Sequence, residues 1–282
     1  MRQTNRCQDY HGHNQVIYQG KAGHMDLGLT GKVAVVTGAG SQIGFGNGIC
    51  VTLAEEGCDV VAADKDLAGA KLTAASVEKL GRRALAVECD VTKKADVDKM
   101  VADALAKFSK VDILVNNAGG TLGRRPFLEQ DDSVWEWELA LNLKGCMLCS
   151  QAVLPHMTAR KYGKIVNIAS ETAKSVSPFM GVSMYSIAKM GVYKFSRDLA
   201  VVAIQDGIYV NCVSPGASLY TDFMTRDIPD MKAAEAEFRR HTPDGEMTKP
   251  RDIAVATAFF ASDLTGHIVG QVLSVSGGGT FQ

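Results

Sequence analysis

The chain has 282 residues, of which 46% are hydrophobic and 22% are charged, and its formal net charge is −1. This composition is typical of a soluble globular protein, and the length fits one large α/β domain better than two small ones. The near-neutral charge gives no support to a nucleic-acid partner or a membrane-surface role. No apolar run approaches the roughly 20 residues that a membrane helix needs.

Residues 1–26 form a polar leader without hydrophobic periodicity and without the apolar core of a signal peptide. We interpret this leader as disordered or derived from a cloning junction, with Met25 as a candidate natural start. The domain is therefore expected to cover residues 27–282.

Short apolar runs alternate with helical patterns from residue 27 onward. The predicted strands are Val33–Thr37, Asp59–Ala63, Arg83–Cys89, Ile113–Asn116, Lys164–Ala169, Ile208–Val213 and Val272–Val275. The predicted helices are Gly46–Glu56, Ala68–Leu80, Lys94–Phe108, Val134–Arg160, Met184–Gln205 and Asp252–Ala261. Continuously apolar strands that alternate with helices indicate parallel βαβ units, with helices on both faces of the sheet. The sequence therefore predicts a doubly wound α/β domain.

One long segment, residues 217–249, interrupts this alternation. It is charged and broken by Pro229, Pro243 and Gly245, and we predict it to be irregular. An irregular segment of that length inside a compact domain is usually functional. We therefore expect a substrate lid here.

The seven cysteines are scattered through the chain. An odd number favours reduced thiols and a cytoplasmic location. One Cys-x-x-Cys pair, Cys146 and Cys149, lies in an apolar stretch of helical character, with no second pair or histidine cluster nearby. Core packing is therefore favoured over redox chemistry or zinc, and no metal site is predicted.

The stretch TGAGSQIGFG, residues 37–46, lies between the first strand and the first helix. Glycines there allow a tight turn and a close approach to a pyrophosphate, which the helix N-terminus attracts. The loop residues assigned to cofactor binding are Gly38, Gly40, Ser41, Gln42, Ile43 and Gly44. Gln42 stands where such loops usually carry glycine. At negative φ it is tolerated at little cost, and its amide can then donate to the pyrophosphate or the ribose.

Asp64 follows the second strand, twenty residues after Gly44. A carboxylate at this place can accept both ribose hydroxyls of an adenosine and repels a 2′-phosphate, so NAD is favoured over NADP. Lys65 can soften that repulsion. The alternative is that Asp64 caps the next helix.

Tyr185 and Lys189 lie four positions apart and share one face of a predicted helix. A phenol is a poor base at neutral pH, but a neighbouring ammonium group lowers its pKa. The tyrosine can then exchange a proton with an alcohol or a ketone. The spacing alone is common by chance.

Taken together, the motifs resemble the classical short-chain dehydrogenase/reductase family over about residues 29–279. The motifs are Thr37-Gly38-x5-Gly44, Cys89-Asp90-Val91, Asn116-Asn117-Ala118-Gly119, Asn142 in LNLKG, Ser170 in IVNIAS, Tyr185-x3-Lys189, Asn211–Gly216 and the closing GQVLSVSGG. The resemblance implies a single Rossmann domain with a seven-stranded parallel sheet, usually assembled as a tetramer.

The resemblance also implies roles for individual residues. Tyr185 would be the acid/base, Lys189 would lower its pKa and hold the nicotinamide ribose, Ser170 would bind the substrate oxygen, and Asn142 would hold a relay water. The remaining implied cofactor contacts are Asp90, Val91, Asn117, Ala118, Gly119, Pro215, Gly216 and Ser218. A longer than usual interval between Ser170 and Tyr185 leaves Thr172 as an alternative to Ser170. Thr221 also comes one residue later than in the common pattern.

Two functions from different classes follow. The first is an NAD(H)-dependent oxidoreductase that interconverts a small-molecule secondary alcohol and a ketone. The second is a degenerate relative that binds nucleotide without turnover, which only Gln42 supports. The four implied catalytic residues argue against the second function.

The substrate is expected to be a cyclic or aromatic alcohol or a 3-hydroxyacyl-CoA. Apolar residues of the expected pocket, among them Phe179, Met180 and Tyr220, favour the ring. Arginine pairs at 124–125 and 239–240 are either surface residues or a site for an anionic tail. Apolar residues on more than one face of the helices at 145–153 and 192–202 favour a homotetramer or homodimer.

Overall fold

The computed structural model describes residues 25–123, 126–175, 183–225 and 228–280. Within these ranges seven strands form one sheet in the order β3-β2-β1-β4-β5-β6-β7, and every neighbouring pair is parallel. The strands are β1 Val33–Thr37, β2 Asp59–Asp64, β3 Ala84–Glu88, β4 Ile113–Asn116, β5 Gly163–Ile168, β6 Ile208–Pro215 and β7 Val272–Val275. The predicted doubly wound sheet is confirmed.

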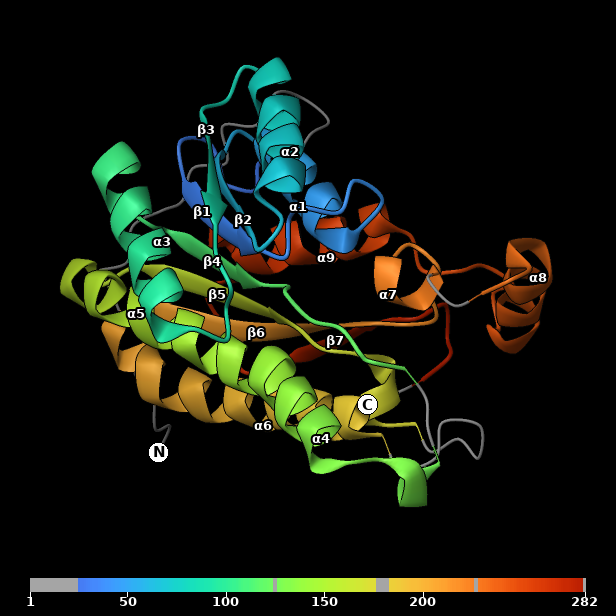
Figure 1. Ribbon diagram of the computed structural model, residues 1–282. Helices are drawn as coiled ribbons and strands as arrows, with labels where there is room; N and C mark the ends of the chain where they lie inside the picture. The colour runs from blue at the N-terminus through green and yellow to red at the C-terminus, as the bar shows by residue number, and fades with distance from the viewer. Residues whose placement is uncertain (1–24, 124–125, 176–182, 226–227, 281–282) are drawn as a thin grey trace, which may run out of the picture.

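Helices cover both faces of this sheet (Figure 1). One layer consists of α1 Phe45–Glu55, α2 Leu67–Lys79 and α9 Pro250–Ala261. The other layer contains α3 Lys94–Phe108, α5 Gly145–Arg160 and α6 Met184–Ala203. No helix in the described ranges is both long enough and apolar enough to cross a membrane.

The strand sequences explain the two layers. Side chains alternate between the faces of a strand. In β1, Ala34 and Val36 therefore pack in the core under α1 and α9, whereas Val33 and Val35 pack in the core under α3 and α5. All five residues of β1 are buried, as a strand covered on both faces requires.

The sheet order fixes where a ligand can bind. The chain passes from β1 to β2 and β3 on one side, and then crosses to β4 and onward on the other side. In open α/β sheets this reversal leaves a crevice outside the carboxyl ends of the two central strands. The loops after β1 and β4 begin at these ends. They contain the predicted site residues 38–44 and 117–119.

The helix predicted over 134–160 is interrupted. The structure instead contains α4 Asp132–Leu139, a π-helical turn Ala140–Lys144 and then α5. In the π turn the Gly145 N–H donates to the Ala140 carbonyl, five residues back. Such turns are uncommon and often mark functional sites.

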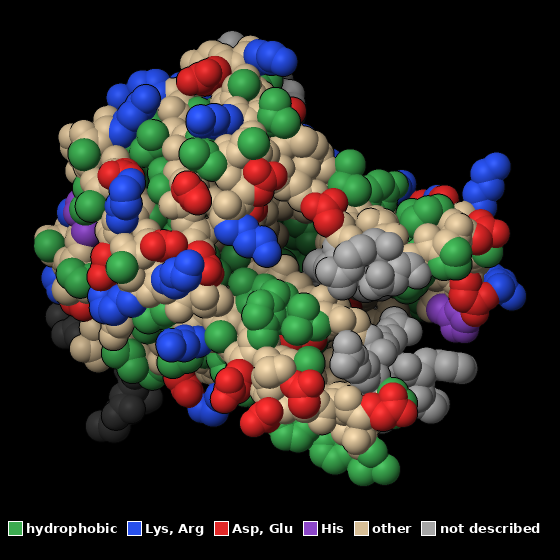
Figure 2. Space-filling view, viewed as in Figure 1, with side chains coloured by type: hydrophobic (Ala, Val, Ile, Leu, Met, Phe, Trp, Pro, Cys, Tyr) green, Lys and Arg blue, Asp and Glu red, His purple; other side chains and the backbone are tan. Residues whose placement is uncertain are grey.

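The predicted lid is not irregular throughout. It contains α7 Asp222–Thr225 and α8 Met231–His241. Helix α8 begins after Asp230, whose side chain accepts the N–H groups of Lys232 and Ala233. No residue of α8 is buried, and the helix projects from the body of the molecule (Figures 1 and 2). A hydrogen bond of 2.9 Å from Thr248 N to Ala217 O joins the two ends of the segment.

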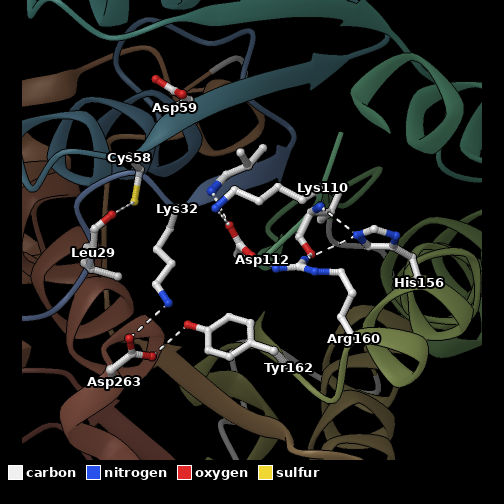
Figure 3. A network of polar contacts seen from close by, with 12 residues as sticks. Leu29, Lys32, Cys58, Asp59, Lys110, Asp112, His156, Arg160, Tyr162 and Asp263 are labelled. Carbon is white, nitrogen blue, oxygen red and sulfur yellow. Dashed lines mark hydrogen bonds and ion pairs between the residues drawn. The ribbon is translucent and has the colours of Figure 1, made fainter. Parts of the chain in front are cut away.

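Charged residues form a network at the amino end of the sheet, opposite the crevice (Figure 3). Lys32 lies 3.0 Å from Asp263, which also accepts a hydrogen bond of 2.7 Å from Tyr162. A second group surrounds Asp112 and includes Arg160. Because this network lies far from the predicted site, it bears on stability rather than on chemistry.

Candidate active site

The glycine-rich loop needs glycine at two positions. Gly38 has φ +67°, and a Cβ there would lie 2.7 Å from Ala118 Cα. A Cβ on Gly46 would lie 2.1 Å from Gly38 O, so any other residue would push α1 away from the loop. The backbone therefore turns tightly from β1 into α1, whose N-cap is Gly44. This arrangement is the one that accepts a phosphate at a helix N-terminus.

Gln42 is accommodated without backbone strain, because it is not among the described residues with positive φ. Its Nε2 donates to Gly40 O at 2.7 Å and lies 3.1 Å from Gly69 O and 3.2 Å from Thr73 Oγ1. The amide therefore ties the loop to α2. The expectation that this donor is directed to the pyrophosphate or ribose is wrong for this conformation, because its hydrogens are already shared among protein acceptors.

We expect Gln42→Gly to change NAD+ affinity by less than about tenfold, because the phosphate-facing N–H groups belong to the backbone. Unfolding free energy should fall by about 1 kcal/mol, because the ties to α2 are lost and glycine is more flexible. Calorimetry measures the affinity, and Gln42→Ala separates the lost amide from glycine flexibility. Absent binding in the wild type, restored by Gln42→Gly, would show that Gln42 closes the site.

Asp64 lies beside the loop. Its Oδ2 accepts the Gly40 N–H at 2.7 Å, and its Oδ1 accepts the Asp66 N–H at 2.9 Å. The N-cap of α2 is Asp66, so the alternative that Asp64 is the helix cap is wrong. Lys65 is exposed. The carboxylate thus stands where β2 ends, at the place expected for the adenosine ribose.

Asp90 and Val91 follow β3 at the same edge of the sheet. Partial burial opposes ionisation of Asp90, but hydrogen bonds from Thr92 and Lys93 hold the pKa of its carboxyl below the ordinary value. Val91 is buried against the start of α5, where a Cβ on Gly145 would lie 2.8 Å from Val91 Cγ2. Both residues therefore lie at the carboxyl end of β3, and their contact with the adenine stays a prediction.

Asn117 joins the two central strands at the crevice. Its Nδ2 donates to Thr37 O and Gly38 O, each at 2.9 Å. In return, the Thr37 hydroxyl accepts the N–H groups of Asn117 and Ala118, each at 3.1 Å. These hydrogen bonds fix the loop after β4 against the start of the glycine-rich loop.

Gly119 comes next and faces the centre of the site. A Cβ on it would lie 2.8 Å from Asn142 Oδ1 and 3.0 Å from Lys189 Nζ. Any larger residue would displace one of these two side chains. The predicted cofactor residue Gly119 is therefore in direct contact with two predicted catalytic residues.

Ser170 and Tyr185 are brought together by β5 and α6. Ser170 lies just beyond β5, and its hydroxyl hydrogen-bonds the Tyr185 side chain. Thr172 donates to Ser170 Oγ through its N–H at 3.3 Å and its hydroxyl at 3.0 Å. This bonding favours Ser170 over Thr172 for the predicted contact with the substrate oxygen.

Lys189 is buried one helical turn after Tyr185, 3% exposed. Its Nζ donates to Ile168 O at 2.9 Å and lies 5.7 Å from the centre of the Tyr185 ring. Burial lowers the pKa of Lys189 to about 8. The lysine is therefore held between the end of β5 and the tyrosine ring.

The pKa of Tyr185 is raised to about 12, mainly by burial and further by the charge of Glu138, while the Ser170 hydrogen bond lowers it. The direction is opposite to the one expected from Lys189. The spacing of Tyr185 and Lys189 in the sequence revealed the nearby cation. It revealed neither the burial of Tyr185 nor the carboxylate of Glu138.

Asn142 occupies the π turn and is 1% exposed. Its Nδ2 donates to Gly120 O at 2.8 Å and Glu138 O at 2.9 Å, and its Oδ1 accepts the Gly120 N–H at 3.0 Å. The side chain thus holds the loop after β4, and its role in a water relay stays a prediction. Glu138 was missed, although a glutamate within an apolar helical stretch was a visible signal.

Pro215, Gly216 and Ser218 line the end of β6. A Cβ on Gly216 would lie 2.7 Å from Ser276 Cα, so the chain passes close to the end of β7. Ser218 is buried, and its Oγ accepts the Tyr220 N–H at 3.2 Å.

Two buried hydroxyls test whether a dinucleotide fits. Ser41 Oγ in the glycine-rich loop and Thr221 Oγ1 beyond β6 are both buried without a hydrogen-bond partner. A buried polar atom without a partner is costly, and a bound ligand is one way to satisfy it. The two atoms belong to the segments assigned to the phosphate and nicotinamide ends, so these residues fit an elongated dinucleotide.

The anionic-tail alternative has less support. Arg239 is paired with Glu235 at 3.0 Å and Glu246 at 2.7 Å, and Arg240 is paired with Glu237. The charges of both arginines are therefore already paired within residues 235–246. The pair at 124–125 and the pocket residues Phe179 and Met180 lie outside the described residues.

The six described cysteines are free and buried. Cys146 and Cys149 are buried in α5, as predicted for core packing. The described residues contain no group of three or more His, Cys, Asp or Glu side chains that could hold a metal ion.

Comparison with known proteins gives consistent matches. A profile of the family described as enoyl-(acyl carrier protein) reductase matches residues 38–280. The chain is 39% identical over 256 residues to a (2S)-[(R)-hydroxy(phenyl)methyl]succinyl-CoA dehydrogenase subunit of Thauera aromatica, covering 89% of this chain and 98% of the relative. It is 38% identical over 251 residues to cis-4-hydroxycyclohexanecarboxylate dehydrogenase of Sinomonas cyclohexanicum, covering 88% and 96%.

A solved structure of a related enzyme has the same fold. It is a 7α-hydroxysteroid dehydrogenase complexed with NADH and 7-oxo glycochenodeoxycholic acid, 34% identical, with a TM-score of 0.83 over 91% of this chain and 97% of that one. Sequence, fold and the joining of Ser170, Tyr185 and Lys189 at one crevice agree. The chain therefore belongs to the short-chain dehydrogenase/reductase family of oxidoreductases.

Proposed function

We propose that the protein is an NAD(H)-dependent oxidoreductase that interconverts a secondary alcohol and a ketone. The observation that supports this proposal most directly is the hydrogen bond between Ser170 and Tyr185. Tyr185 lies one helical turn from Lys189, at the crevice beside the glycine-rich loop. A phenol and a hydroxyl that share one hydrogen bond can hold a carbonyl or carbinol oxygen between them and exchange its proton.

Each residue then has a physical task. Tyr185 gives or takes the proton, Ser170 orients the substrate oxygen, and Lys189 places positive charge near the phenol. The loop residues 38–44 and Asp64 would hold the phosphates and ribose of NAD, whereas residues 117–119 and 215–218 would border its nicotinamide half. When bound, NAD supplies the hydride donor or acceptor.

The choice of NAD rests on Asp64. Its carboxylate is fixed by two backbone N–H groups at the end of β2, so it cannot easily turn away from a 2′-phosphate. A fixed negative charge at this place disfavours a second one on the ligand. The solved relative bound to NADH is consistent with this choice.

Asp64→Ala is expected to raise KM for NAD+ and to relax discrimination against NADP+ by about tenfold or more, because the charge facing the 2′-position is removed. Asp66→Ala is the matched control, since Asp66 is an exposed carboxylate two residues away. Initial rates at 340 nm with NAD+ and with NADP+ give the KM for NAD+ and the discrimination between the two cofactors. A wild type that already prefers NADP+ would contradict the assignment.

The substrate proposed is a secondary alcohol on or beside an apolar ring. The two relatives and the solved structure are named for ring-bearing hydroxy compounds or their ketones. The pairing of Arg239 and Arg240 with glutamates removes one candidate site for an anionic tail. A 3-hydroxyacyl-CoA remains the second class to assay, because one relative acts on a CoA ester.

A substrate screen tests the proposal directly. Cyclic secondary alcohols, aryl alcohols and 3-hydroxyacyl-CoA esters are offered with NAD+ or NADP+, and absorbance is followed at 340 nm. Turnover of any secondary alcohol supports the proposal. NADH binding without turnover of any alcohol or ketone would favour the degenerate nucleotide-binding alternative instead.

We also propose a homodimer or homotetramer in the cytoplasm. Val201 and Val202 on α6 are 73% and 74% exposed, and Met147 on α5 is 45% exposed. A second set of exposed apolar side chains lies on other elements and includes Phe259 on α9 and Leu273 on β7, each 39% exposed. Two exposed patches suit two different two-fold contacts, and hence a tetramer. The six free cysteines of the described chain fit a reducing compartment.

Light scattering at micromolar concentration is expected to give the mass of two or four chains. Val202→Glu should lower that mass, because a buried charge at an apolar contact is costly. The control is Lys107→Glu on α3, which also changes an exposed side chain but lies outside both patches. A wild-type mass equal to one chain would contradict the assembly.

A further inference from the structure

Glu138 is a buried carboxylate outside the four predicted catalytic residues. It is 3% exposed and lies in the last turn of α4, one helical turn before Asn142. Carboxylates are almost never buried this completely unless other groups bind them.

The contacts all go to the loop after β4. Glu138 Oε1 accepts the hydroxyl of Thr121 at 2.5 Å and the N–H of Leu122 at 3.0 Å. Asn142 binds both the N–H and the carbonyl of Gly120. Its Nδ2 also donates to the Glu138 carbonyl, which links the two side chains through the helix backbone. One helix face thus holds three consecutive loop residues.

That loop forms part of the site. Gly119, the residue before it, packs against Lys189 Nζ and Asn142 Oδ1 so closely that no side chain fits there. Because Gly119 is packed tightly against Lys189, a shift of Thr121 or Leu122 that moves Gly119 would also move the lysine. A displacement of about 1 Å in such a group can cost about 100-fold in rate.

We propose that Glu138 is a positioning residue of the reaction, which holds the loop Gly120–Leu122 in place and thereby keeps Gly119 against Lys189. This inference rests on the proposed oxidoreductase function.

The charge has a second consequence. Among the described residues, the titratable groups that act on or contact Tyr185 include Glu138 from α4 and Lys189 and Tyr193 from α6 itself. Of these, Glu138 raises the pKa of Tyr185. Alcohol oxidation needs the phenolate as base, so its rate rises with pH through this pKa. Removing the charge should therefore move that rise to lower pH.

Two substitutions separate the two roles. Glu138→Gln keeps an oxygen that can accept from Thr121 and Leu122 but removes the charge. Glu138→Leu removes both the accepting oxygen and the charge. Glu136→Gln on the same helix is the control, because Glu136 is exposed.

Two readouts are used. Hydrogen exchange of the Leu122 amide reports the loop and needs no substrate. The pH profile of oxidation, with KM and kcat at each pH, reports the reaction. We expect Glu138→Leu to speed Leu122 exchange and to raise KM, each by about tenfold, since a hydrogen bond to a charged group is lost. We expect Glu138→Gln to keep both values near wild type and to shift the profile to lower pH.

Each result decides something. Wild-type exchange and KM in Glu138→Leu would overturn the positioning role, and an unshifted profile in Glu138→Gln would overturn the role of the charge. If Glu138→Leu does not fold, Glu138→Gln still tests the charge, and its retained Leu122 protection still tests the loop contact. If the wild type oxidises no alcohol, only the proposed function fails, and the exchange data still decide whether Glu138 holds the loop.

Discussion

Turnover is expected to fall by about 100-fold to 10,000-fold in Tyr185→Phe, because the only group removed is the hydroxyl that transfers the proton. The benzene ring of phenylalanine fills the same space beside Lys189, so the lysine keeps its hydrogen bond to Ile168 O. NADH affinity should therefore stay within about threefold of wild type, less than the difference that one neutral hydrogen bond makes.

Initial rates at 340 nm and calorimetric titration with NADH measure the two quantities. The control is Tyr209→Phe, which removes a phenol hydroxyl at the amino end of β6, beside Lys164 and away from the crevice. That variant should keep wild-type rates. A rate for Tyr185→Phe within about tenfold of wild type would reject Tyr185 as the acid/base.

The raised pKa of Tyr185 bears on the direction of the reaction. With a pKa of about 12 in the chain alone, the phenol is protonated at neutral pH. A protonated phenol can donate to a developing alkoxide but cannot accept a proton from an alcohol. In the proposed reaction this protonated form is the one that donates a proton to the oxygen of a ketone as it is reduced. Oxidation needs either higher pH or added positive charge near the phenol, which lowers its pKa.

The strands were predictable because each is a short apolar run that ends at a turn signal. β1, β4 and β7 begin and end at the predicted residues, and the other strands differ by one or two residues at one or both ends. A parallel sheet buried on both faces requires such runs, so the local pattern and the fold agree. The same agreement located the crevice, because the loop motifs follow the strands directly.

The interruption at Ala140–Lys144 was not predictable from periodicity. The helical pattern continues through it, and the side chain that accompanies the π turn, Asn142, is bound to Gly120, a loop residue distant in sequence. By contrast, α8 had a local signal that we overlooked. Asp230 is an N-cap residue type and caps this helix.

Site details failed for a similar reason. The ties from Gln42 to Gly69 and Thr73 join residues that are adjacent only after α2 packs on the loop. The sign of the Tyr185 pKa shift depends on burial and on Glu138, whereas the sequence revealed only Lys189. Residue types therefore predicted which groups meet, but not the electrostatic balance among them.

Asp112→Asn should cause a large loss of stability, although Asp112 lies away from the crevice. Asp112 is 1% exposed and precedes β4 (Figure 3). It binds Arg160 at 2.6 Å, Lys110 at 2.9 Å and the Val33 N–H at 2.9 Å. Removing one member of a buried ion pair typically costs about 3–5 kcal/mol. Because both cations are about a third exposed, we expect the lower end, about 3 kcal/mol.

The pH dependence has a definite sign. Burial alone would raise the pKa of Asp112, but hydrogen bonds from Lys110, Arg160 and the Val33 N–H lower it below its ordinary value. A carboxyl whose pKa is lower in the folded state stabilises the fold above its unfolded pKa of about 3.9. That contribution disappears as pH falls through the folded pKa. The difference between wild type and Asp112→Asn should therefore be full at neutral pH and shrink below about pH 4.

Urea unfolding at pH 7 and at a series of acidic pH values measures this difference, at one protein concentration because assembly affects apparent stability. Asp98→Asn is the matched control, since Asp98 pairs with Lys94 on the surface of α3 and is 50% exposed. It should cost less than about 1 kcal/mol. If Asp112→Asn costs no more than this control, the network at the amino end of the sheet does not stabilise the fold. A cost that stays constant into acid would instead mean that shape rather than charge makes Asp112 necessary.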